Sequence, residues 1–201
     1  MLDYAFKHID KVYFDIYRKA CRMKMNRDIK IDIDNNIQLR TLKKNNVTEK
    51  YVAWLNDYEI MKYTEQKYFK HSFSSVCDFV DQKYDSENDL LFGIFSNYTH
   101  IGNIKLGPIS WEHRSAEVSY FIGDKNYWGR GIATKCVDSI VKYGTKVLLL
   151  EKINAGYYEL NIGSEKVFKK CGFCIEGVRV SDVVFEDKRF NLILVGFVPK
   201  L

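Results

Sequence analysis

Apolar and polar positions alternate along several short segments of the chain, which is the pattern of half-buried β-strands. The first such segment begins at Ile37, where Ile37 and Leu39 are separated by polar residues. Further strands are predicted at 90–95, 101–106, 117–122, 152–157, 173–180 and 189–198. The segments from 90 to 122 follow one another closely, with Asn97 as a turn residue and a break at Gly107 and Pro108. This spacing predicts an antiparallel meander.

Other segments repeat their apolar residues at helical spacing. Thr48 and Ser74 each precede such a stripe and are expected to cap a helix. A longer helix with one buried face is predicted after Gly131, and a further helix is predicted at 162–170. The sum is a mixed α+β fold in which helices flank both faces of a largely antiparallel central sheet.

The chain is long enough for one main domain with a complete core. It has 201 residues, of which 46% are hydrophobic, and no segment rich in Gly, Ser or Pro divides it. Residues 1–30 carry an irregular apolar stripe that ends in a basic stretch, which predicts a helical N-terminal extension. Residues 31–201 are expected to form the main domain.

Charge and apolar patterning argue against several kinds of partner. The formal charge of +5 is modest and the basic residues are interleaved with acidic ones, so no nucleic-acid partner is expected. No window approaches the roughly 18 consecutive apolar residues of a membrane span. The N-terminus also lacks the apolar core of a signal peptide. We therefore expect a cytoplasmic protein, and the sequence leaves a homodimer open.

The five cysteines are odd in number and scattered, unlike the disulfide framework of a secreted domain. Cys171 and Cys174 have CxxC spacing, yet no second pair or flanking histidine completes a zinc site. We interpret them as ordinary thiols and expect no metal.

The segment at 126–134 has the features of an anion-binding site. Gly129 and Gly131 precede the long predicted helix, whose first N–H groups lack intrahelical acceptors and lie at the positive end of the helix dipole. The glycines allow phosphates to approach the backbone closely. The segment differs from a Walker P-loop and lacks the third glycine of a dinucleotide fingerprint. Two glycines before a helix are also compatible with an ordinary helix start.

Two motifs in this order resemble those of the GNAT acetyltransferase superfamily. Gly129 and Gly131 match its pyrophosphate loop, whereas Asn126 stands where the family has Gln or Arg. The second cofactor motif is matched by Asn161, Ser164, Phe168, Lys170, Gly172 and Phe173. The resemblance covers 37–198 and is nearest to the ribosomal-protein and amino-sugar acetyltransferase branch.

The resemblance implies the GNAT acyl-CoA N-acyltransferase fold and transfer of an acetyl group from acetyl-CoA to a primary amine. Main-chain N–H groups at 120–122 would face the thioester carbonyl, and Asn161 would hydrogen-bond the pantetheine arm. As ordinary structural alternatives, Asn161 would cap a helix and Ser164 would be a solvated hydroxyl. The implied cofactor-binding residues are Tyr120, Phe121, Ile122, Trp128, Gly129, Arg130, Gly131, Ile132, Ala133, Thr134, Asn161, Ser164, Phe168 and Lys170.

Direct acetyl transfer requires a base that removes a proton from the amine. Glu117, on the strand before the pyrophosphate loop, is the first candidate, with an outward solvated residue as the alternative. Glu65 and His71, in the polar segment 63–73, are the next candidates. In the family a tyrosine usually protonates the leaving thiolate, but Phe168 occupies that position. The remaining candidates for that role are Ser164, Tyr158 and solvent.

We favour a nucleotide-linked amino sugar as the acceptor, because 152–158 resembles acetyltransferases of nucleotide-activated amino-sugar pathways. Exposed aromatic and basic side chains at 63–70 would contact a base, a sugar or a diphosphate. These residues are Tyr63, Tyr68 and Phe69 for stacking, and Lys67 and Lys70 for the diphosphate. A loop folded onto the core is the alternative.

Two other functions stay open at this point. A protein N-terminus or an aminoglycoside is a second choice of acceptor, because loops determine acceptor choice on a shared cofactor fold. A non-catalytic module that binds acyl-CoA or a partner protein is an alternative of another class, suggested by Phe168 and Asn126.

Overall fold

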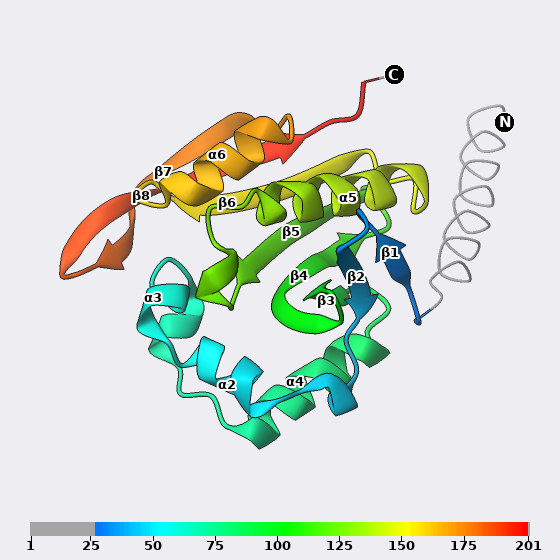
Figure 1. The fold of residues 1–201 in the computed structure, drawn as a ribbon. Helices are drawn as coiled ribbons and strands as arrows, with labels where there is room; N and C mark the ends of the chain where they lie inside the picture. Colours follow the sequence, from blue (N-terminus) through cyan, green and yellow to red (C-terminus); the bar gives the residue numbers. More distant parts are fainter. Residues whose placement is uncertain (1–26, 201) are drawn as a thin grey trace, which may run out of the picture.

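The computed structural model describes residues 27–200, which contain an eight-stranded sheet in the order β1-β2-β3-β4-β5-β6-β8-β7 (Figure 1). Neighbouring strands run antiparallel except β5 and β6, which are parallel. The predicted meander corresponds to β3, β4 and β5. The strands are β1 (Lys30–Asp32), β2 (Ile37–Thr41), β3 (Leu90–Ser96), β4 (Thr99–Ser110), β5 (Ser115–Ile122), β6 (Lys152–Tyr158), β7 (Cys174–Phe185) and β8 (Lys188–Phe197).

Helices cover both faces of the sheet, as predicted (Figure 1). One hydrophobic cluster joins α5 and α6 to the sheet, and a second joins α2, α3 and α4 to β3 and to Leu42, just after β2. The α+β fold is therefore confirmed. The helices are α2 (Glu49–Leu55), α3 (Tyr58–Met61), α4 (Phe73–Asp85), α5 (Ile132–Lys146) and α6 (Ile162–Lys170), with short 3₁₀ turns η1 (Lys44–Asn46), η2 (Glu65–Tyr68) and η3 (Lys125–Tyr127).

Some local predictions differ from the structure. Ser72, not Ser74, caps α4, because the side chains of Ser72 and Ser75 each accept the other residue's backbone N–H. Gly107 and Pro108 lie inside β4, where the chain continues through a cis peptide and an irregular register. The predicted helical extension lies outside the described residues up to residue 26, and β1 already begins at Lys30.

The parallel pair β5 and β6 is held together at one end only. Its register covers Ser115 to Glu117 on β5, opposite Lys152 to Asn154 on β6. Beyond this point β5 remains paired with β4 as far as Ile122, while β6 remains paired with β8 as far as Tyr158. The two strands therefore separate toward their carboxyl ends, and α5 and α6 begin at that end of the sheet.

Gly123, just after β5, packs tightly against α2. A Cβ at this position would lie 2.1 Å from Cδ2 of Trp54. We expect Gly123→Ala to lower the free energy of unfolding by about 1–3 kcal/mol, because the buried indole must shift. Urea unfolding of Gly177→Ala is the control, since its added Cβ would lie 3.7 Å from the nearest atom, Cδ1 of Leu194. Equal stability of the two variants would contradict this packing.

Candidate functional site

The loop between β5 and α5 presents backbone N–H groups to solvent. Gly129 and Gly131 both have left-handed φ values, +73° and +74°, and a Cβ at either would have nothing within 4 Å. Glycine adopts this backbone without strain and leaves the loop open to a ligand. The indole Nε1 of Trp128 donates to the carbonyl of Ile122 at 2.8 Å, which ties the loop to the end of β5.

Helix α5 begins without a side-chain cap, unlike the other α-helices of residues 27–200. Gly131 is its N-cap and makes no side-chain hydrogen bond. The first-turn N–H groups of α5 therefore remain available, and the helix dipole favours an anion there. The side-chain caps of the other helices are Thr48 for α2, Asp57 for α3, Ser72 for α4 and Asn161 for α6.

The other predicted residues of this segment differ in how far their side chains are exposed. Arg130 is exposed, with its guanidinium over the ring of Tyr127. The side chain of Ile132 is buried in the core, and the carbonyl of Thr134 accepts a hydrogen bond from Cys171. Ile132, Ala133 and Thr134 thus offer first-turn N–H groups to a ligand. The loop fits the diphosphate of acetyl-CoA through its backbone.

A cleft of about 570 Å³ lies where β5 and β6 separate; we call it the β5–β6 cleft. Its walls come from β5, β6, the start of α6 and the β7–β8 hairpin. Residues predicted from distant parts of the sequence meet here. Those that line it are Glu65, Tyr120, Tyr158, Asn161, Ser164 and Phe168.

Asn161 caps α6, which was the alternative to a cofactor contact, and it also lines the β5–β6 cleft. Its Oδ1 accepts the N–H of Ser164 at 3.0 Å. The Ser164 hydroxyl lies 3.2 Å from the hydroxyl of Tyr120. Ser164 is therefore held by two contacts and is not a free surface hydroxyl.

Phe168 and Lys170, from the second motif, have different surroundings. Phe168 is buried between the rings of Tyr120, Tyr157 and Phe173, and it forms part of the cleft floor. Lys170 is exposed in the last turn of α6 and lines neither of the two clefts described in this section.

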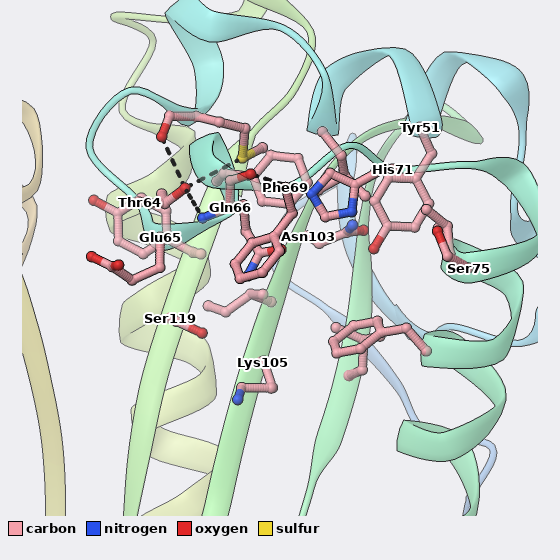
Figure 2. Close-up of a pocket in the computed structure, with 18 of the residues that line it drawn as sticks. Tyr51, Thr64, Glu65, Gln66, Phe69, His71, Ser75, Asn103, Lys105 and Ser119 are labelled. Atoms are coloured by element: carbon pink, nitrogen blue, oxygen red, sulfur yellow. Dashed lines mark hydrogen bonds between the residues drawn. The ribbon is translucent and has the colours of Figure 1, made fainter.

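A second cleft, also about 570 Å³, lies between the sheet and the segment from α2 to α4; we call it the α4-side cleft (Figure 2). Glu65 and Ser119 lie at one end of it, and Tyr51 and Ser75 lie at the other. The two clefts share four lining residues. These are Thr64, Glu65, Ser119 and Tyr120.

Glu65 stands at this junction and is held by Tyr158. The Tyr158 hydroxyl donates a hydrogen bond to Oε1 of Glu65. Burial raises the pKa of Tyr158 well above its usual range, and the carboxylate of Glu65 raises it further. Tyr158 therefore keeps its proton and holds Glu65 through one of its two carboxylate oxygens.

Glu117 and His71 are placed less favourably for catalysis. Glu117 is an exposed residue of β5 that lines neither cleft, which matches the alternative stated for it. His71 lines the α4-side cleft, and its Nε2 lies 3.4 Å from the carbonyl of Gln66. Of the three predicted bases, only Glu65 lines both clefts.

Part of the predicted acceptor-binding segment is packed against the β7–β8 hairpin. The ring of Tyr63 contacts Phe185 and Tyr158. The Lys67 ammonium and the Tyr68 hydroxyl both donate to the carbonyl of Val184. These residues thus follow the alternative of a loop folded onto the protein. Phe69 and Lys70 line the α4-side cleft.

Several residues of the α4-side cleft carried no sequence signal. Tyr51 comes from α2, whereas Asn103 and Lys105 come from β4, and all three were predicted only as helix or strand residues. Ser119 is an outward residue of an alternating strand. Only the alternation along β4 and β5 indicates that such residues share a face.

No helix of residues 27–200 has the length and apolar character to span a membrane. No group of His, Cys, Asp and Glu in this part of the chain is arranged to hold a metal ion.

Residues 36–174 match the model of the acetyltransferase (GNAT) domain. The chain therefore belongs to the GNAT acetyltransferase family. It is an N-acetyltransferase that uses acetyl-CoA, and family membership favours the enzyme over the non-catalytic module.

Three similar proteins illustrate the range of this family. The probable N-acetyltransferase YjcK of Bacillus subtilis (strain 168) is 34% identical over 120 residues, which cover 56% of this chain and 66% of that protein. The spermidine N(1)-acetyltransferase of Escherichia coli (strain K12) is 26% identical over 79% of this chain and 84% of its own length. The microcin C7 self-immunity acetyltransferase MccE, solved with acetyl-CoA and AMP, has a TM-score of 0.71 at 19% identity, covering 84% of this chain and 96% of its own.

Proposed function

We propose that this enzyme acetylates a primary amine at the junction of the two clefts, with Glu65 as the general base. The observation that carries this proposal is the shared lining of the clefts by Thr64, Glu65, Ser119 and Tyr120. In this arrangement acetyl-CoA is held by the α5 N-terminus and the β5–β6 cleft. The amine enters from the α4-side cleft and meets the acetyl group at the junction.

The proposed base has the geometry that proton removal requires. Glu65 is anchored through Oε1 by Tyr158, so its other oxygen accepts a proton from the ammonium directly or through one water. Bound acetyl-CoA supplies an acetyl group activated as a thioester. Strand β5 has no partner strand on its β6 side beyond Glu117, so main-chain N–H groups at 120–122 on that side are available to its carbonyl oxygen.

For the acceptor we propose a nucleotide-linked amino sugar. Lys70 and Lys105 line the α4-side cleft together with Phe69 and Phe79, whereas Glu65 is the one carboxylate among its described lining residues. Phe69 is 63% exposed, which leaves its ring free to stack on a base or sugar. A polyamine with several positive charges would meet Lys70 and Lys105, of which Lys105 is paired with Asp89 at 3.8 Å, and Glu65 is the one carboxylate among the described lining residues. The cleft is therefore better suited to an amine carried by an anionic or aromatic group.

The acceptor is tested by comparing kcat/KM for four amines: a nucleoside-diphosphate-linked amino sugar, spermidine, an aminoglycoside and a peptide with a free N-terminus. We expect the nucleotide-linked amine to be the best substrate. Lys70→Gln should lower its kcat/KM by about two- to fivefold, because an exposed ionic contact contributes under about 1 kcal/mol. Lys146→Gln, at the far end of α5, is the matched control. Faster turnover of spermidine or of the peptide would overturn this choice of acceptor.

A further inference from the structure

Tyr120 occupies a position between the two clefts that its predicted main-chain role does not explain. It lies on β5, its side chain is partly buried, and it is the one tyrosine that lines both clefts. The other tyrosines lining a cleft are Tyr51, on the α4 side, and Tyr63, Tyr157 and Tyr158, on the β5–β6 side.

The Tyr120 ring and hydroxyl are both held in place. Its ring meets Phe168 edge-on, with 5.8 Å between centroids. Its hydroxyl lies 3.2 Å from Oγ of Ser164, which is itself fixed by the N-terminal cap of α6. A phenol fixed by a second hydroxyl costs little reorganisation when charge develops beside it, which is the condition for electrostatic catalysis.

Acetyl transfer places negative charge on sulfur. The amine nitrogen forms a bond to the carbonyl carbon, the carbon–sulfur bond breaks, and its electron pair leaves on the sulfur of CoA. Phe168 has no polar atom to offer, and the Tyr158 hydroxyl is already donated to Glu65. Tyr120 is therefore the phenol that lines both clefts and is fixed without donating to a carboxylate.

We propose that the Tyr120 hydroxyl donates a hydrogen bond to the leaving sulfur as the carbon–sulfur bond breaks, and that Ser164 is the positioning residue for that hydroxyl. The proposal rests on the proposed location of acetyl transfer at the junction of the clefts.

The raised pKa of Tyr120 agrees with a hydrogen bond from its hydroxyl to the sulfur, without complete transfer of the proton. Burial raises the pKa of Tyr120 to about 12, although the Ser164 contact lowers it. An ordinary thiol has a pKa of about 8.5, so the phenol holds its proton in the presence of the thiolate. The amine nitrogen sheds its excess protons to Glu65 and solvent, and the thiolate then takes its proton from solvent.

The test compares Tyr120→Phe with the wild-type enzyme, using whichever amine proves the best acceptor. We expect kcat to fall by about 10²- to 10³-fold, the loss typical of removing one donor to a developing anion. Calorimetry should give a Kd for acetyl-CoA within about twofold of the wild type, because the ring remains. Tyr143→Phe, which removes a phenol from the opposite end of α5, is the control for loss of a buried hydroxyl.

A second variant separates this role from a structural one. Phe168→Tyr, made in the Tyr120→Phe background, returns a hydroxyl to the same cleft, and recovery of kcat would support the proposal. The proposal is overturned if Tyr120→Phe keeps a kcat near that of the wild type, or if weaker acetyl-CoA binding accounts for the whole loss. If the nucleotide-linked amino sugar proves not to be a substrate, this test can still be made with any amine that the enzyme acetylates. Absence of turnover by the wild type would count against the proposed function instead.

Discussion

Replacement of Gly131 by glutamate should raise the Kd for acetyl-CoA by more than about 10²-fold. The added carboxylate lies at the N-terminus of α5, where unpaired N–H groups and the helix dipole favour an anionic ligand, and it repels the diphosphate. Gly131 also has φ +74°, which costs a non-glycine residue about 1–2 kcal/mol. Calorimetric titration of the folded variant with acetyl-CoA measures the combined effect.

Gly131→Ala is the matched control for the charge. Its Cβ would meet nothing within 4 Å, so alanine brings the backbone strain without the carboxylate. We expect its affinity for acetyl-CoA to lie between those of the wild type and Gly131→Glu. Thermal unfolding of both variants separates loss of binding from loss of folding. If Gly131→Glu is folded and binds acetyl-CoA as tightly as the wild type, the phosphates do not bind at this loop.

The second large effect is expected from Glu65→Gln, which should lower kcat by about 10²- to 10⁴-fold, the usual contribution of a positioned base. Glutamine keeps the size of the side chain and its contact with Tyr158, but it does not accept the ammonium proton. The Kd for acetyl-CoA should stay close to that of the wild type. Steady-state kinetics together with calorimetry measure both quantities.

Two further variants help to interpret the loss of kcat in Glu65→Gln. Glu59→Gln removes a carboxylate from the exposed pair with Lys62, outside both clefts, and is the matched control. Tyr158→Phe keeps the carboxylate but releases it from its anchor, so an intermediate loss of kcat is expected. Full activity of Glu65→Gln would exclude Glu65 as the base and would return the role to His71 or to a water chain.

The elements predicted most accurately are those whose start and stop signals lie close together in the sequence. Helix α6 has the predicted bounds, because a capping residue, Asn161, and a stop at Gly172 enclose one helical pattern. The start of α5 after Gly131 was predicted for the same reason, since two glycines and the following helix are adjacent in the chain. Pro108 was misplaced because β4 continues through an irregular register between Leu106 and Ile109, where a proline is tolerated within a strand.

The α4-side cleft was largely beyond prediction because its residues come from separate elements. Tyr51 lies on α2, Asn103 and Lys105 lie on β4, and none has a motif of its own. The role of Tyr120 was missed for a related reason. Its contact with Ser164 joins residues 44 positions apart, and it depends on the separation of β5 from β6. Lys67 was expected at a ligand, but its ammonium donates to the carbonyls of Lys62 and of Val184 in the β7–β8 hairpin.

The most direct test of the central claim is a crystal structure of the enzyme with acetyl-CoA bound. The account predicts the diphosphate on the N–H groups of Gly129 to Gly131 and the pantetheine between β5 and β6. It also predicts the thioester sulfur within hydrogen-bonding reach of the Tyr120 hydroxyl. A diphosphate bound away from the α5 N-terminus, or a thioester outside the junction of the two clefts, would contradict it.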